Sequence, residues 1–196
     1  MKLTRITVLA FAALLFAVPA QAQDFMFKPY VGGGIGAYEL DYGNGTDFVV
    51  GGYGALGADL HEFLAAEVRF GSAGSKTKND ATTNLATSDV KKSVSWFVSY
   101  LVKPRIEVTD GLRFYGLVGA STVKSDIQAG TAAKREKTDT DLSFGGGAEY
   151  QITDNFTVGA EWLRLTSSKD TAALGATSGY KGMDINSFVG TLRVDF

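Results

Sequence analysis

Residues 93–108 read Ser-Val-Ser-Trp-Phe-Val-Ser-Tyr-Leu-Val-Lys-Pro-Arg-Ile-Glu-Val, and their side chains alternate in character. Every second residue from Val94 to Val108 is apolar, whereas the other parity is polar except for Phe97 and Leu101. A repeat of two predicts a β-strand, because an amphipathic helix groups its apolar residues three and four apart. Strands usually have about five or six residues, but about 9–11 tilted residues are needed to cross a bilayer. The length of this segment therefore favours a membrane-crossing strand.

The C-terminal segment, Asn186 to Phe196, shows the same alternation and ends on an aromatic residue. A strand with one apolar face needs apolar material outside it. In a soluble sandwich this is a second sheet, and in a membrane barrel it is lipid. The outward apolar positions that we interpret as a C-terminal assembly signal are Phe188, Leu192, Val194 and Phe196.

The N-terminus has the layout of a secretory signal peptide. Lys2 and Arg5 provide the positive start, Ile6 to Val18 carries no charge, and Ala20-Gln21-Ala22 supplies small residues for cleavage. The uncharged run is too short for a transmembrane helix, which needs about 20 residues. We therefore expect residues 1–22 to be a cleaved signal peptide and residues 23–196 to form one exported domain.

Composition narrows the function of that domain. Without Lys2 and Arg5, the 19 basic residues fall to 17 against 21 acidic ones, which gives a net charge of about −4 and argues against a nucleic-acid partner. The chain has no cysteine, so it cannot use disulfides or cysteine metal sites. The 24 glycines and three prolines suit curved, tightly packed strands.

The alternation predicts eight strands, and the connections between them alternate between short and long. Tight turns at one rim and polar loops at the other are typical of a membrane barrel. The expected fold is all-β, an eight-stranded antiparallel up-and-down transmembrane β-barrel. The expected strands are 28–40, 47–60, 63–72, 93–108, 112–123, 140–152, 156–166 and 184–196, and the long loops are 73–92, 124–139 and 167–183.

Aromatic residues gather near both ends of the predicted strands. Phe114 and Phe156 fall near the short turns, whereas Trp96 and Trp162 fall near the long loops. Two such belts mark the two interfaces of a membrane, so we interpret these four residues as interface aromatics.

The segment Gly-Gly-Ala-Glu-Tyr-Gln-Ile-Thr-Asp-Asn at 146–155 resembles the sixth strand and following turn of the eight-stranded barrels typified by outer membrane protein A. Pro-Tyr-Val-Gly-Gly-Gly-Ile-Gly at 29–36 is similar to the first strand of those barrels and of opacity-type surface antigens. The resemblance implies a Gram-negative outer-membrane location and roles in envelope integrity, adhesion or host contact. It also implies insertion by the barrel assembly machinery. Larger relatives carry a peptidoglycan-binding domain, which we do not expect here because the chain ends on its last strand.

The inward parity carries charges of both signs, which must pair because unpaired buried charges are costly. A packed polar plug is one interpretation, and a narrow or gated pore is the other. In the resembled barrels an interior cluster of glutamate, arginine and lysine acts as a gate. Glu67, Lys103, Glu149 and Glu161 match its glutamate and lysine positions, but Gly159 stands where the arginine is expected, so we hypothesise that Arg69, Arg105 or Arg193 substitutes.

Motifs for enzymatic chemistry fail on inspection. Gly52 to Gly57 matches a dinucleotide fingerprint, but it runs along a strand instead of opening a helix. His61-Glu62 lacks the second histidine of a zinc-protease motif, and His61, the only histidine, belongs to a short turn. We therefore expect no enzyme activity, no cofactor and no metal.

The expected protein is a monomer in the cell outer membrane, surrounded by membrane lipids and lipopolysaccharide. Its long loops are rich in small and polar residues, and a host or surface ligand is a candidate partner for them. We consider Lys124, Lys134, Arg135 and Arg164 as contacts for lipopolysaccharide phosphates. A small pore is the alternative function. A soluble periplasmic lipocalin-like carrier is a third, but it would need an apolar interior and a polar outside.

Overall fold

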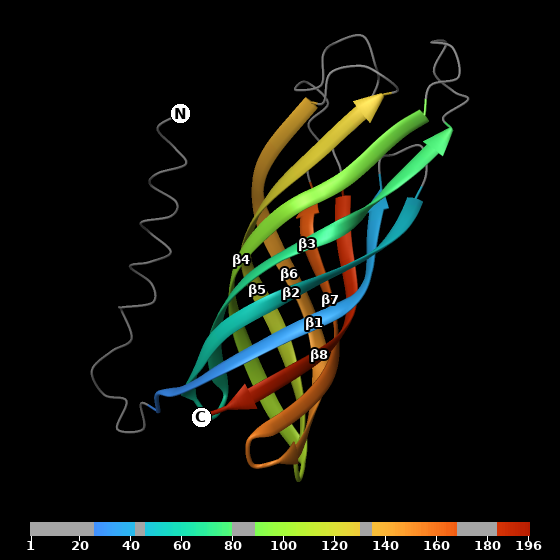
Figure 1. Ribbon diagram of the computed structural model, residues 1–196. Coiled ribbons are helices and arrows are strands. Elements are labelled where there is room, and N and C mark those ends of the chain that lie inside the picture. Colours follow the sequence, from blue (N-terminus) through green and yellow to red (C-terminus); the bar gives the residue numbers. More distant parts are fainter. Residues whose placement is uncertain (1–25, 42–45, 80–88, 130–134, 168–183) are drawn as a thin grey trace, which may run out of the picture.

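The computed structural model describes residues 26–41, 46–79, 89–129, 135–167 and 184–196, which form a closed antiparallel barrel (Figure 1). Each strand pairs with its neighbours in sequence, and β8 pairs with β1 to close the barrel. The strands are β1 (Lys28–Asp41), β2 (Thr46–His61), β3 (Leu64–Asn79), β4 (Asp89–Thr109), β5 (Leu112–Ala129), β6 (Arg135–Thr153), β7 (Phe156–Ser167) and β8 (Asp184–Asp195). The predicted fold and the predicted strand order are confirmed. The proposed signal peptide lies outside the described residues.

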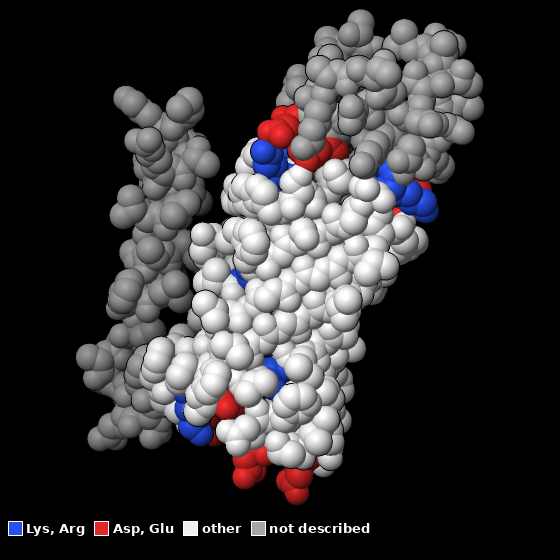
Figure 2. All heavy atoms as spheres, viewed as in Figure 1, with Lys and Arg blue, Asp and Glu red and all other residues white. Residues whose placement is uncertain are grey.

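Large apolar side chains cover the outside of the barrel. Ile35, Leu56, Phe70 and Leu142 are each more than 60% exposed. Figure 2 shows a broad band with very few charged atoms, and most acidic and basic side chains gather at its two ends. A water-soluble protein rarely exposes so large an apolar surface. None of the described residues forms a helix that could cross a membrane.

Four strands are longer than the sequence pattern predicted. β3 continues to Asn79, β4 begins at Asp89, β5 continues to Ala129 and β6 begins at Arg135, so much of the predicted loops 73–92 and 124–139 is strand. The loop prediction was wrong there. These extensions carry polar residues at both parities, for example Lys76-Thr77-Lys78, so they lack the alternation of a strand with one apolar face.

The repeat of two puts Val94 on the same outward face as Trp96 and Val108, and this prediction was wrong. Its side chain is 2% exposed and belongs to the interior cluster that contains Phe97. The pairing of β4 with β5 shifts register between Val94 and Trp96, which indicates a β-bulge. One extra residue reverses the facing of every side chain beyond it, so the parity counted from Val108 holds only as far as Trp96.

The barrel wall is taller on one side than on the other. Pairing of β2 with β3 ends at Gly51–Ala73, and pairing of β6 with β7 ends at Phe144–Arg164. Beyond these points β3, β4, β5 and β6 continue as a four-stranded sheet, which rises above the other strands in Figure 1. We call this the projecting sheet.

Candidate functional site

A buried arginine organises the centre of the barrel interior. Arg69 on β3 is 1% exposed, and its guanidinium donates hydrogen bonds to both carboxylate oxygens of Glu161 on β7, with Nη2 2.9 Å from Oε2. Its Nε donates to Oε1 of Glu67 at 2.5 Å. A bidentate arginine–carboxylate pair is the strongest common ion-pair geometry. One cation therefore ties opposite walls of the barrel together.

Tyrosine hydroxyls supply the remaining donors to these two carboxylates. Tyr53 and Tyr115 each donate to Glu161 at 3.0 Å, and Tyr30 donates to Glu67 at 2.9 Å. The Tyr53 ring also lies 4.4 Å below the Arg69 guanidinium carbon, in a cation–π contact. These tyrosines shield the buried charges and satisfy their hydrogen bonds, which is what makes such a network tolerable in a closed interior.

A second ion pair lies beside the first. Lys103 on β4 donates to Oε2 of Glu149 on β6 at 2.5 Å, and its ammonium nitrogen is 3.9 Å from the centre of the Tyr115 ring. Arg113 is 3.7 Å from Oε1 of Glu149 and donates to Gln151 at 2.6 Å. Tyr115 therefore connects the two pairs, because its hydroxyl binds Glu161 and its ring faces Lys103.

A third group of charges closes the end of the barrel near the short turns. Asp59 accepts from Arg105 at 2.8 Å and from Arg193 at 2.7 Å. Arg105 also donates to the Glu62 carbonyl at 2.8 Å, and Arg193 donates through Nε to Asp195 at 2.8 Å. The short turn between β2 and β3 is thus held to β4.

The charges of this interior network balance, since five acids face five bases. The acids are Asp59, Glu67, Glu149, Glu161 and Asp195, and the bases are Arg69, Lys103, Arg105, Arg113 and Arg193. A cavity of about 20 Å³ lies among them, lined by Tyr30, Tyr53 and Tyr115. A water molecule needs about 10–15 Å³, so this space suits one water, and Oε1 of Glu149 lacks a hydrogen-bond partner there.

An apolar cluster fills much of the interior nearer the long loops. Its side chains include Tyr38, Phe97, Leu117, Leu163 and Ile185, all of them nearly inaccessible. Three serines lie at the level of this cluster: Ser143 donates to Ser121 at 2.7 Å, and Ser121 contacts Ser99, which stands between Leu101 and Phe97 on β4, at 2.6 Å. The sequence reasoning did not predict this apolar cluster, which lies above the charged layer; Asp47 and Asp126 nearer the long loops are also buried.

Comparison with known proteins identifies the family of this barrel. The family model described as outer membrane protein beta-barrel domain matches residues 8–196, nearly the whole chain. The chain belongs to this family. This protein is thus a transmembrane barrel, and its apolar outer face contacts lipid. No curated protein sequence matches the chain.

Solved structures of other outer-membrane proteins share the barrel fold. Neisserial surface protein A is 13% identical with a TM-score of 0.61, and the match covers 86% of this chain and 97% of that one. Ail, the attachment invasion locus protein of Yersinia pestis, solved with the heparin analogue sucrose octasulfate, is 12% identical with a TM-score of 0.58. That match covers 87% of this chain and 99% of Ail.

The seven interior charges selected from the sequence are all buried and all take part in the network. Arg69 is the arginine that pairs with Glu161, whereas Arg105 and Arg193 bind Asp59 in the group near the short turns. The sequence reasoning did not select Tyr30, Tyr53, Tyr115 or Arg113. Counting in steps of two from Asp59 along β2 would have placed Tyr53 inward, but tyrosine also occurs on the outer face, as Tyr100 and Tyr150 show.

The other selected residues lie on the outside of the barrel. Phe188, Leu192 and Phe196 are about half exposed or more, and Val194 is partly exposed. Phe114 is exposed, Phe156 and Trp96 are partly exposed, and Trp162 packs edge-on against Phe144 with ring centres 5.9 Å apart. These placements suit contact with lipid.

The cations described near the upper rim are already paired. Lys124 contacts Glu136 at 2.6 Å and Arg164 contacts Asp184 at 3.0 Å, whereas Lys134 and the Arg135 side chain lie outside what the structure describes. A lipopolysaccharide phosphate would therefore have to displace an acid from either side chain. Within the described ranges, no three acidic or histidine side chains converge to hold a metal ion.

Proposed function

We propose that this protein is a non-conducting, non-enzymatic surface barrel of the outer membrane, exported by a cleaved signal peptide. Its role is to stabilise the envelope and to present the projecting sheet and its loops to a ligand or host surface. The observation that carries this proposal is the filled interior, in which a neutral ion-pair network is stacked below an apolar cluster.

The two layers block conduction in different ways. The charged layer has a central cavity that suits a single water. The apolar layer is built mainly of hydrocarbon side chains, and Leu40, Leu117 and Leu163 in it are almost completely buried. Opening the ion pairs alone would leave the apolar layer in place, which favours a plug over a gate.

The refolded protein should therefore insert into planar bilayers without discrete conductance steps. Lys103→Met, which breaks the pair with Glu149, should fold and stay silent, because the apolar cluster does not depend on that pair. Single-channel recording checks both, with heat-modifiable gel mobility as the control for folding. Steady steps in the wild type, or steps that appear only in the variant, would support the gated pore instead.

The projecting sheet and the loops support the interaction role. At about 3.3 Å per residue, the 21 residues of β4 extend well beyond the membrane-crossing length of about 9–11 residues. Ail shares the fold and was solved with a polyanionic heparin analogue, so a sulfated glycan is a reasonable first ligand to test. Insertion by the barrel assembly machinery, guided by Phe188, Leu192, Val194 and Phe196, belongs to the same proposal, as does a monomeric state.

A further inference from the structure

The hydrogen-bonded wall of the barrel is interrupted between β4 and β5. Val102 pairs with Val118 and Arg105 pairs with Tyr115, but the residues between them do not pair across the two strands. The unpaired positions are Lys103 and Pro104 on β4, and Gly116 and Leu117 on β5. Both sides keep the same register, so this is a local opening and not a slip of one strand.

Proline causes the opening. The Arg105 amide donates to the Phe63 carbonyl, on the β3 side, at 2.9 Å. Backbone amides alternate sides along a strand, so position 104 would direct its amide at β5, opposite Gly116. Proline has no N–H to offer there, and prolines within sheets are mostly confined to edges and bulges. The Gly116 carbonyl thus lacks the donor that the ladder would supply.

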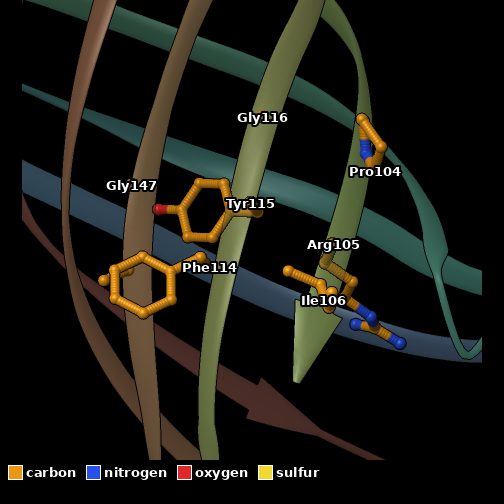
Figure 3. Close-up of a pocket in the computed structure, with 8 residues that line it drawn as sticks. Pro104, Arg105, Ile106, Phe114, Tyr115, Gly116 and Gly147 are labelled. Carbon is orange, nitrogen blue, oxygen red and sulfur yellow. The ribbon is translucent and has the colours of Figure 1, made fainter. Parts of the chain in front are cut away.

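A groove lies over the opening on the lipid-facing side (Figure 3). Its volume is about 760 Å³, and Pro104, Ile106, Phe114, Gly116 and Ala148 line it. Pro104 is five residues from the end of β4 at Thr109, which places the groove about 13 Å above the short turn for a strand tilted by about 40°. This height lies inside the hydrocarbon layer, in the half nearer the short turns.

We propose that this groove is a lateral binding site for one acyl chain of a diacyl phospholipid. The groove is continuous with the lipid-facing surface of the barrel, so hydrocarbon is the material in contact with it. The polar ends of the two inward residues behind it are engaged elsewhere, because Arg105 binds Asp59 and the Tyr115 hydroxyl binds Glu161. What remains toward lipid is apolar, which suits methylene groups and not a charged headgroup.

Tyr115 separates the groove from the barrel interior. It lines both the groove and the small central cavity. Figure 3 shows its ring turned from β5 toward Gly147 on β6, and a side chain at Gly147 would lie within 2.7 Å of that ring. The acyl chain therefore stops at the Tyr115 ring and does not enter the charged layer.

Photolabelling tests this site. The protein is reconstituted in phosphatidylethanolamine and phosphatidylglycerol vesicles that contain a phosphatidylethanolamine with a diazirine on its acyl chain. After irradiation, peptide mass spectrometry should find adducts on residues 104–116 several-fold more often than on other lipid-facing segments. Gly116→Leu should cause a several-fold loss of these adducts, because the added Cβ meets only Pro104 at 3.6 Å and the side chain fills the groove.

Gly54→Leu is the matched control. It adds the same side chain to an outward glycine with no atom within 4 Å of the new Cβ, away from the groove, so labelling of 104–116 should not change. Pro104→Val restores the missing N–H and should also reduce labelling, which keeps the test decisive if Gly116→Leu fails to fold. Adducts spread evenly around the barrel, equal labelling of Gly116→Leu and Gly54→Leu, or crosslinks to a second copy of the chain would overturn the proposal.

Discussion

Replacing Arg69 with methionine is expected to cost about 3–5 kcal/mol of unfolding free energy, the usual loss when one partner of a buried ion pair is removed. The substitution keeps most of the side-chain volume but leaves Glu67 and Glu161 without their shared cation. Both carboxylates are at most 6% exposed, so water cannot replace the guanidinium. Equilibrium urea unfolding in phospholipid vesicles, followed by the fluorescence of Trp96 and Trp162, measures the loss.

Two further variants separate buried charge from charge in general. Lys124→Met removes a pair with Glu136 whose side chains are 27% and 49% exposed, and it should cost less than about 1 kcal/mol. Adding Glu67→Gln and Glu161→Gln to Arg69→Met should restore part of the stability, because no charge then remains unpaired in this layer. If Arg69→Met and Lys124→Met unfold at the same urea concentration, the interior network does not stabilise the barrel.

Gly119→Val is expected to prevent barrel closure or to destabilise it by more than about 3 kcal/mol, above the usual range for an overpacked core. A Cβ at Gly119 would lie 1.9 Å from the Tyr100 carbonyl oxygen on β4. That neighbour is backbone in a paired strand, so it cannot move aside without breaking the β4–β5 ladder. Refolding yield, scored by heat-modifiable gel mobility, is the measurement.

Gly116→Val is the control for this prediction. It lies three residues away on the same strand, but its new Cβ would meet only the Pro104 side chain at 3.6 Å. It should refold as the wild type does. Both variants replace a glycine of β5 with valine. Equal refolding yields would therefore show that the close approach at Gly119 does not limit folding.

The membrane-crossing part of the fold could be predicted because lipid imposes a rule on every second residue. Outward positions such as Ile106 and Leu142 must be apolar, and this regularity reveals strand, register and facing together. The rule ends where lipid ends. The extensions of β3 to β6 carry polar residues at both parities, as in Lys76-Thr77-Lys78, and therefore resemble loops in sequence. The bulge next to Trp96 was also hidden, since Val94 is apolar whichever way it faces.

The sequence could predict which charged residues belong to the candidate site but not which of them pair with one another. Charges such as Glu161 and Lys103 are conspicuous at inward positions of a lipid-facing strand. Which acid meets which base depends on the stagger between strands that are far apart in sequence, as in the pairing of Arg69 with Glu161. The apolar cluster nearer the long loops was missed because an inward apolar residue cannot be told from a lipid-facing one by residue type.

The unequal lengths of the strands make the two flanks of the barrel different. β4 has 21 residues and β7 has 12, so one flank is about 30 Å longer along its strand. Among the described residues, β3 to β6 therefore extend farther above the membrane than β7 and β8. A partner that binds the projecting sheet would thus be held over one flank of the barrel and away from the barrel axis.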